Sequence, residues 1–309
     1  MRKETLFTID ALPYRQPIPV YGYYFGNETK TLAVMGAIRG DEFQQMYTAA
    51  QLIKRLSELE KQGRLSDKCG ILVIPCAGQF SMNVEHRFWP LDNTDINRMF
   101  PGYNAGETTQ RLASRIFDAL KGYCWGIHLT SLYLPGDFEP HIRIMDTGLQ
   151  KNETGLDFGL PYLVIRTPHP YDTTTLNYNW QVWETNTFSL YTRATDSIDE
   201  KSANEAINSI LRFLAKREMI DEKDIAPGVE TQELNEKNLV TVHNKRGGIL
   251  LRQHSPGDKI TRGEEIAQII DPYTSEVREK IFSPSDGVIF FARHAQILPS
   301  HTVVFRIIA

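Results

Sequence analysis

Two patterns of hydrophobic and polar positions alternate along the first two-thirds of the chain. Residues 31–38 (TLAVMGAI) and 70–74 (GILVI) are short, nearly continuous apolar runs, which is the pattern of buried strands. Between them, apolar residues recur at spacings of three and four, the period of a helix: Phe43, Met46, Ala50, Ile53 and Leu56. Asp41 stands just ahead of that series and is the expected helix N-cap.

The same alternation continues after a long irregular stretch at residues 76–107. Further elements follow: a helix marked by Leu112, Ile116 and Leu120, strands at 123–129, 162–166 and 188–192, and an amphipathic helix at 203–215. Strands that alternate with helices predict an α/β fold, with a parallel or mixed sheet flanked by helices on both faces. Ligands of such folds bind beyond the carboxyl ends of the strands.

The helical period ends after a charged, loop-like segment at residues 222–238. We therefore predict an α/β domain at 1–230 and a small all-β domain at 231–309. The second contains two similar halves, which open at Gly248 and Gly287 with glycine, apolar residues and a basic residue. These halves predict a barrel-sandwich module that resembles the biotinyl/lipoyl type. Because the turn at 271–276 has no lysine for a carrier group, we interpret the module as a structural or lid element.

Composition and charge indicate a folded protein and argue against nucleic-acid and membrane partners. The chain has 309 residues, 41% of them hydrophobic and 23% charged, which is typical of folded domains. With a net charge of -4 and no basic stripe, nucleic acid is not an expected partner. No apolar stretch has the length of a signal peptide or a membrane span, and the three cysteines form no metal or disulfide pattern. We expect a cytoplasmic protein without a membrane partner.

Two polar stretches carry the candidate chemistry: AIRGDE at 37–42 and RFWPLDNTDINRMFPG at 87–102. The second resembles the signature of the succinylglutamate desuccinylase/aspartoacylase family, a branch of the zinc-carboxypeptidase-like (M14-like) hydrolases. The resemblance extends through His128 and Pro140-His141 to the C-terminal β module. It implies a zinc-carboxypeptidase-like α/β domain and an enzyme that hydrolyses an amide bond of an N-acyl amino acid or peptide-like substrate.

The resemblance also implies a zinc site, because the family binds zinc through a His-x-x-Glu pair and a later histidine. Glu42 and His128 occupy two of these ligand positions. Arg39 stands at the first histidine position, and a guanidinium has no lone pair to donate to zinc. Gly126 takes the place of an aspartate that precedes the later histidine by two. Zinc is therefore expected only if another ligand replaces the first one.

Other matched positions concern substrate and catalysis. Arg87, Asn97 and Arg98 resemble the family's substrate-binding residues, and Arg39 adds a fourth basic or polar group to them. Tyr191 aligns with the general-base glutamate, while Glu184, seven residues earlier, aligns with the preceding segment. Glu184, Tyr191 and Arg98 are the candidate catalytic residues.

Three functions remain open from the residues alone. A metal-dependent amide hydrolase needs a replacement ligand, for which His86, His141 and His169 are available. A catalytically degenerate member (a pseudoenzyme) would bind a small carboxylate or peptide terminus without zinc hydrolysis, with Arg39 paired to Glu42. A metal-independent hydrolase would use Tyr191 or Glu184.

The same residues also have purely structural interpretations. Arg39 with Glu42 would be a surface ion pair, His128 a core histidine, and Arg98 a partner of Asp92 or Asp95. Homo-oligomerisation is left open.

Overall fold

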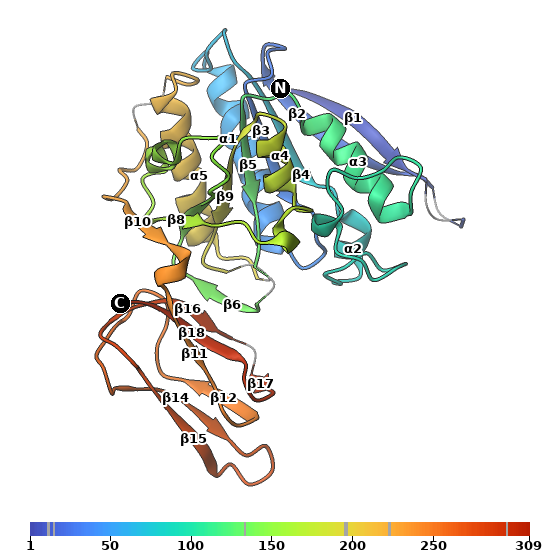
Figure 1. Ribbon diagram of the computed structural model, residues 1–309. Helices are drawn as coiled ribbons and strands as arrows, with labels where there is room; N and C mark the ends of the chain where they lie inside the picture. Colours follow the sequence, from blue (N-terminus) through green and yellow to red (C-terminus); the bar gives the residue numbers. More distant parts are fainter. Residues whose placement is uncertain (11–12, 15, 133, 195–196, 222–223, 295) are drawn as a thin grey trace. The chain divides into compact units, whose positions relative to one another are not determined.

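The protein consists of two compact units (Figure 1), each of which is described by itself. The structure, a computed structural model, describes every residue except 11–12, 15, 133, 195–196, 222–223 and 295. Unit 1 comprises Met1–Ser131 and Pro140–Glu233, and unit 2 comprises Leu132–Glu139 and Leu234–Ala309.

Unit 1 carries a large sheet and most of the helices. Its strands are β1 (Arg2–Ile9), β2 (Ile18–Gly26), β3 (Leu32–Ala37), β4 (Gly70–Cys76), β5 (Trp125–Leu129), β7 (His141–Met145), β8 (Tyr162–Arg166) and β9 (Asn186–Tyr191), followed by β10 (Gln232–Asn235) at the junction of the units. Its helices are α1 (Phe43–Lys61), α2 (Gln79–Asn83), α3 (Thr108–Leu120), α4 (Leu176–Val182) and α5 (Glu200–Lys216), with 3-10 turns η1 (Ile96–Arg98), η2 (Asn152–Phe158) and η3 (Pro170–Asp172).

The nine-stranded sheet has the order β1-β2-β4-β3-β5-β9-β7-β8-β10. Strands β4, β3, β5 and β9 run parallel to their neighbours in this central group, whereas β2 and β7 pair with it antiparallel. The prediction of an α/β fold with a mixed sheet is therefore confirmed. The carboxyl ends of β3, β5 and β9 lie at one edge of the sheet, where the fold rule places a ligand.

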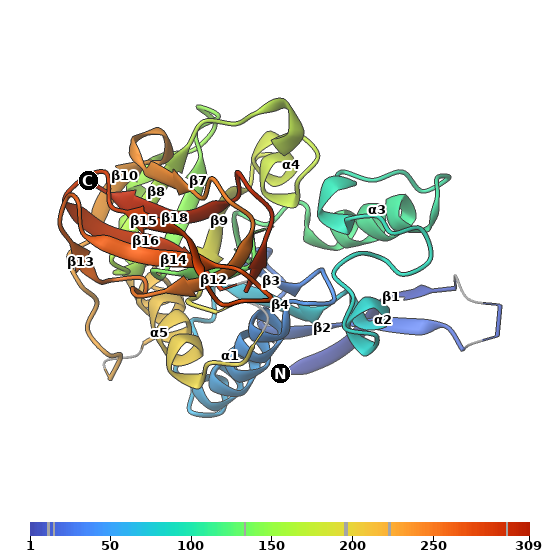
Figure 2. The same ribbon diagram turned by 90° about the horizontal axis from the view of Figure 1, so that it is seen from below.

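Helices cover both faces of this sheet (Figure 2), and β3 shows why. All of its residues are buried. Leu32 and Val34 belong to one hydrophobic cluster with α1 and α5, while Ala33 and Met35 belong to another with α3 and α4. Because successive side chains of a strand point to opposite faces, a strand buried on both faces is apolar at every position.

The apolar pattern misses the first two strands. β1 and β2 pair antiparallel at the edge of the sheet, and the first four residues of β1 are exposed. Such an edge strand carries polar side chains and gives no continuous apolar run. The stretch predicted as irregular at 76–107 also contains α2 and η1, which are too short for a periodic signal.

Unit 2 contains β6 (Gly136–Phe138) together with the C-terminal strands. These are β11 (Val240–His243), β12 (Gly248–Arg252), β13 (Lys259–Ile260), β14 (Glu265–Ile270), β15 (Val277–Phe282), β16 (Gly287–Arg293), β17 (Ile297–Leu298) and β18 (Val303–Ile308), with one 3-10 turn η4 (Glu236–Asn238). They form one sheet of five strands and one of four. β12 and β16 open the two similar halves of the sequence, and residues 271–276 join β14 to β15.

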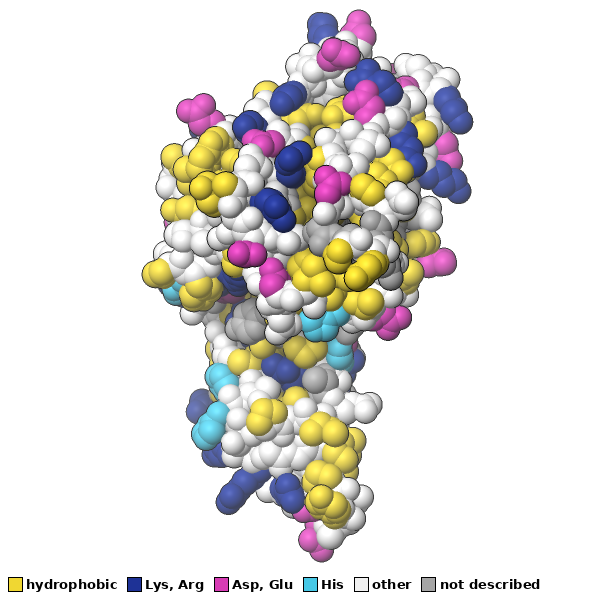
Figure 3. All heavy atoms as spheres, turned by 90° about the vertical axis from the view of Figure 1, so that its right-hand side faces the viewer, with side chains coloured by type: hydrophobic (Ala, Val, Ile, Leu, Met, Phe, Trp, Pro, Cys, Tyr) yellow, Lys and Arg dark blue, Asp and Glu magenta, His cyan; other side chains and the backbone are white. Residues whose placement is uncertain are grey.

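The surface mixes both signs of charge. On the face shown in Figure 3, Lys and Arg side chains lie among Asp and Glu side chains and apolar residues. In the part of the chain that the structure describes, no helix is both long and apolar enough to cross a membrane.

Gly126 in β5 is required by packing. A Cβ atom at this position would lie 2.9 Å from atoms of the Trp180 ring. Trp180 is fully buried, and its indole Nε1 donates to the Leu120 carbonyl at 3.0 Å, which fixes the ring. The residue that the family resemblance leads us to expect here, an aspartate, would therefore collide with α4.

We predict that Gly126→Ala destabilises the protein by about 1–3 kcal/mol, the usual cost of overpacking a core. Urea unfolding measures the loss. Combining it with Trp180→Leu, which removes the ring, should cost less than the sum of the two single variants. Additive losses would show that the indole is not the limiting contact.

Candidate functional site

The candidate site begins at the turn that joins β3 to α1. Gly40 lies in this turn, and a Cβ atom there would stand 2.2 Å from the His86 carbonyl oxygen. Only glycine allows this close approach of two backbone segments. The Gly40 amide donates to the Arg87 carbonyl at 3.3 Å. The turn is thereby joined to the second polar stretch of the sequence.

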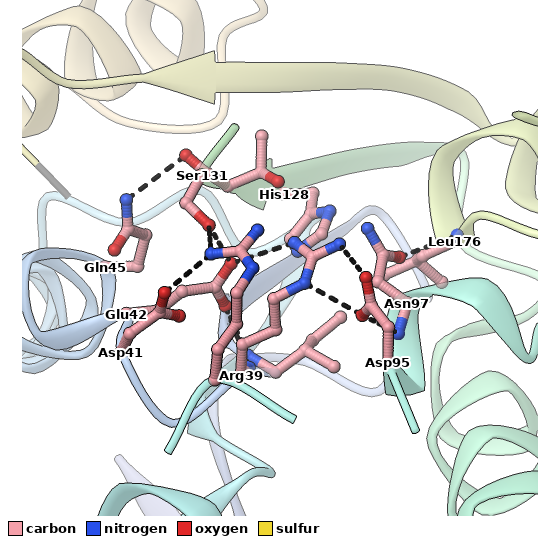
Figure 4. A network of polar contacts seen from close by, with 12 residues as sticks. Arg39, Asp41, Glu42, Gln45, Asp95, Asn97, His128, Ser131 and Leu176 are labelled. Atoms are coloured by element: carbon pink, nitrogen blue, oxygen red, sulfur yellow. Dashed lines mark hydrogen bonds and ion pairs between the residues drawn. The ribbon is translucent and has the colours of Figure 1, made fainter. Parts of the chain in front are cut away.

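Arg39 lies between two carboxylates (Figure 4). Its Nε donates to Asp95 Oδ1 at 2.9 Å and its Nη2 to Asp95 Oδ2 at 3.0 Å, a bidentate pair. Its Nη1 donates to Glu42 Oε1 at 3.1 Å. Only 5% of the Arg39 side chain is exposed, so the interpretation as a surface ion pair is wrong.

Glu42 accepts hydrogen bonds from four donors. Its Oε2 accepts from the backbone amides of Ile38 at 2.8 Å and Arg39 at 3.0 Å. Its Oε1 accepts from Ser131 Oγ at 2.6 Å as well as from the Arg39 guanidinium. Glu42 is fully buried, and these bonds use both of its oxygen atoms.

The charges of this cluster stabilise one another. Burial is the largest single effect and raises the pKa of a carboxyl group, but the Arg39 cation together with the other nearby cations and hydrogen-bond donors outweighs it and holds the pKa of both Glu42 and Asp95 below the usual values. Burial opposes the charge of Arg39 too, yet the two carboxylates keep its pKa above normal. All three groups are therefore ionised at neutral pH.

His128 lies near the carboxyl end of β5, as predicted, and is 1% exposed. Its Nδ1 is 3.0 Å from Asn177 Oδ1, and the Asn177 amide nitrogen in turn donates to Ser189 Oγ at 2.6 Å. This arrangement assigns the ring proton to Nδ1. Nε2 is buried and has no hydrogen-bond partner among the described residues. Burial lowers the pKa of His128 to about 4, so the ring is neutral at pH 7.

Arg87 is the second arginine of the cluster. Its Nη1 donates to Asp41 Oδ2 at 2.7 Å and to Ser131 Oγ at 3.3 Å. Its Nη2 is buried without a hydrogen-bond partner among the described residues. Asp41 is thus a partner of Arg87, and the helix prediction is corrected: α1 has Glu42 as its N-cap residue, with no side-chain capping bond.

Asn97 and Arg98 lie on η1, next to this cluster. Asn97 Oδ1 accepts from the Leu176 amide at 3.0 Å, which ties η1 to the start of α4. Arg98 donates to the Tyr171 carbonyl at 2.6 Å and has Asp172 at 3.9 Å. The expectation that Asp92 or Asp95 binds Arg98 is therefore wrong.

The candidate catalytic residues of the α4–β9 region are placed differently. Glu184 is exposed in the turn before β9, at the amino end of the strand, so the structure does not bring it to the carboxyl edge beside Arg39. Tyr191 lies at the carboxyl end of β9. Its hydroxyl accepts from Arg143 at 3.2 Å, and its ring stacks on His141 with centroids 4.6 Å apart.

The residues present do not fit a zinc ion. Arg39 has no lone pair, and both oxygens of Glu42 are already bonded to N–H and O–H donors. Among the described residues, no group of three or more His, Cys, Asp or Glu side chains is arranged to hold a metal. His86 and His169, considered as replacements, contact the Phe88 carbonyl and the Tyr171 ring instead.

Three contributors were missed by the sequence analysis: Asp95 as the partner of Arg39, Ser131 as a donor to Glu42, and Asn177 as the partner of His128. Asp95 belongs to the polar stretch at 87–102 that carries the family resemblance, which was a signal. Ser131 follows a predicted strand, which was a weaker one. Nothing in the sequence pairs Asn177 with a residue 49 positions earlier.

Comparison with known proteins supports the resemblance. Residues 28–129 match the sequence model of the succinylglutamate desuccinylase/aspartoacylase catalytic domain. The N-alpha-acetyl-L-2,4-diaminobutyric acid deacetylase of Halomonas elongata is 25% identical over 146 residues. That alignment spans 45% of this chain and only 40% of the deacetylase.

Solved structures share the fold over nearly the whole chain. A succinylglutamate desuccinylase/aspartoacylase family protein of Shewanella amazonensis superposes with a TM-score of 0.80 at 16% identity, covering 99% of this chain and 98% of that one. An aspartoacylase family protein of Mesorhizobium loti gives 0.79 at 16% identity, covering 97% and 92%. Residues 28–129 are thus similar to the catalytic domain of the succinylglutamate desuccinylase/aspartoacylase family, and the solved structures show that nearly the whole chain has the same fold as these proteins.

Proposed function

We propose that the protein is a metal-free member of this amide-hydrolase family, whose site binds a small carboxylate or a peptide terminus without zinc-dependent hydrolysis. One observation carries the proposal: Arg39 contacts Glu42 and Asp95 together, in a site where the family resemblance expects a metal ligand. Glu42 is left with no free lone pair directed to a metal.

The donors for an anionic ligand are retained. Arg87 Nη2 is buried and has no hydrogen-bond partner among the described residues, and Asn97 contacts the Leu176 amide through its Oδ1, not through its amide nitrogen. Arg98 is one-third exposed and uses only Nη1 in its contacts with Tyr171 and Asp172. Guanidinium and amide N–H groups match the geometry of a carboxylate, which accepts two parallel hydrogen bonds.

The family match favours a second candidate, an amide-bond hydrolase that acts on an N-acyl amino acid or peptide-like substrate. The aligned relative is a deacetylase, which supports this class of reaction, although the alignment covers less than half of either protein. In this candidate Tyr191 would act as the acid or base, since it lies at the carboxyl end of β9, the edge of the sheet that carries the site.

A thermal-shift assay with short carboxylates and N-acetyl amino acids separates the two candidates. We expect a bound carboxylate to raise the melting temperature of the wild-type protein, by about 5 °C at a hundredfold excess over Kd. Arg98→Ala should abolish this rise, because it removes a guanidinium from the binding group. The matched control is Arg111→Ala, which removes an exposed arginine of α3 and should leave the rise unchanged.

Two results would contradict the metal-free binder. One is a drop of several degrees in the melting temperature on adding a chelator, because a bound metal stabilises the native state. The other is steady release of free amine from an N-acyl amino acid, which would establish the hydrolase instead.

Neutral, buried His128 gives the site a defined pH dependence. Its pKa is about 4 in the folded protein and about 6.5 in the unfolded chain, so the unfolded state binds the proton first as pH falls. Stability from this group is complete above pH 6.5 and is lost between pH 6.5 and 4, by about 3 kcal/mol. Glu42 and Asp95, whose pKa values are lowered, add their loss at still lower pH.

We therefore predict that His128→Gln flattens the dependence of the unfolding free energy on pH between 6.5 and 4. Urea titrations at several pH values measure it. His243→Gln, which removes an exposed imidazole of β11, is the control and should keep the wild-type slope. An unchanged slope in His128→Gln would mean that the ring takes up its proton as readily in the folded protein as in the unfolded chain, which contradicts the prediction.

A further inference from the structure

The site holds an arginine where the family resemblance places a histidine ligand. We infer that Arg39 takes the electrostatic role of the metal ion, as the fixed cation of the site, and that Asp95 is the residue that holds it there. This inference rests on the proposed function only in that the site is metal-free; it does not depend on which ligand binds.

A contact other than the one with Arg39 orients the Asp95 side chain. Its carboxylate accepts from the Asn97 amide at 3.0 Å and so caps the 3-10 turn η1. Both of its oxygens then face the Nε and Nη2 atoms of Arg39, at 2.9 and 3.0 Å. A planar guanidinium supplies two parallel donors for this contact, and a lysine ammonium does not.

Glu42 is oriented in the same manner from the other side. The amides of Ile38 and Arg39 bind one of its oxygens, and Ser131 binds the other. Arg39 Nη1 donates the remaining hydrogen bond to Glu42 Oε1, at 3.1 Å. The Arg39 guanidinium thus bridges the carboxylates of Glu42 and Asp95. Each carboxylate is also held by backbone amides.

Burial makes this cation necessary. Glu42 is fully buried and Asp95 is only 17% exposed, and an uncompensated carboxylate in such a place is strongly unfavourable. A bound metal ion is one source of compensating charge, and a permanently protonated guanidinium is another. Because the guanidinium belongs to the chain, the site keeps its cation whatever the supply of metal.

His128 retains the features of a metal ligand without having one. Its ring is neutral and its Nδ1–H is bonded to Asn177, as ligand histidines are oriented by a second hydrogen bond. Its Nε2 lone pair is buried and has no hydrogen-bond partner in the described part of the chain. A histidine at position 39 would therefore add the missing third donor to Glu42 and His128, giving the two-imidazole, one-carboxylate set of catalytic zinc sites.

The test compares zinc binding by the wild-type protein and by Arg39→His, each dialysed against zinc and then against buffer. We expect substoichiometric zinc in the wild type and one zinc per chain in Arg39→His. Zinc should raise the melting temperature of Arg39→His by roughly 5 °C, reversed by a chelator, and should not change that of the wild type. Arg55→His, on the partly exposed side of α1, is the matched control and should gain neither zinc nor stability.

Stoichiometric zinc in the wild-type protein overturns the inference, and so does a folded Arg39→His variant that binds none. If Arg39→His does not fold, the wild-type measurement decides alone. A zinc-free wild type that binds no carboxylate, with a zinc-binding Arg39→His variant, refutes the proposed ligand while leaving the role of Arg39 intact.

Discussion

The bidentate pair between Arg39 and Asp95, shared with Glu42, is the interaction on which the site depends. Three charged side chains are largely buried, and each is tolerated only because the other two compensate its charge. The surrounding structure is arranged around them: the Gly40 turn allows α1 to begin beside β3, and η1 brings Asp95 to the guanidinium. Such a buried cluster fixes geometry more than it adds stability, since replacing it by apolar groups is often neutral, whereas removing one partner is not.

The sheet determines where this cluster lies. The parallel strands β3 and β5 end at the same edge, so the turn after β3 and His128 near the end of β5 come together although they are almost ninety positions apart in the sequence. The helices on the two faces keep this edge in place through the apolar side chains of both clusters. Trp180 of α4 packs on Gly126, two residues before His128, so the same helix that supplies Asn177 to the ring also closes the space beneath it.

The fold of this protein tolerates more sequence change than the chemistry of its site. Proteins with about 16% identity share the fold over almost the entire chain, because the sheet and its cover require only apolar side chains of suitable size in a suitable pattern. The centre of the site depends on individual atoms: an imidazole has a lone pair for a metal, and a guanidinium has none. Under the proposed function, the guanidinium at position 39 gives the site a chemistry without metal on an architecture that is retained.

The sequence by itself determined the alternation of strands and helices and the mixed sheet, because periodicity reports which faces are buried. The replacement of a metal ligand by Arg39 stays a prediction from the family resemblance, based on the atoms that a guanidinium offers. The sequence did not determine which side chains of the site contact one another. Only the tertiary structure paired Asp95 with Arg39 instead of Arg98, joined Asp41 to Arg87, and placed Glu184 at the far end of β9. These contacts join residues tens of positions apart, and their formation depends on the paths of irregular loops, which carry no periodic signal. The edge strand β1 was missed for a related reason, since a strand whose first half is exposed does not form an apolar run.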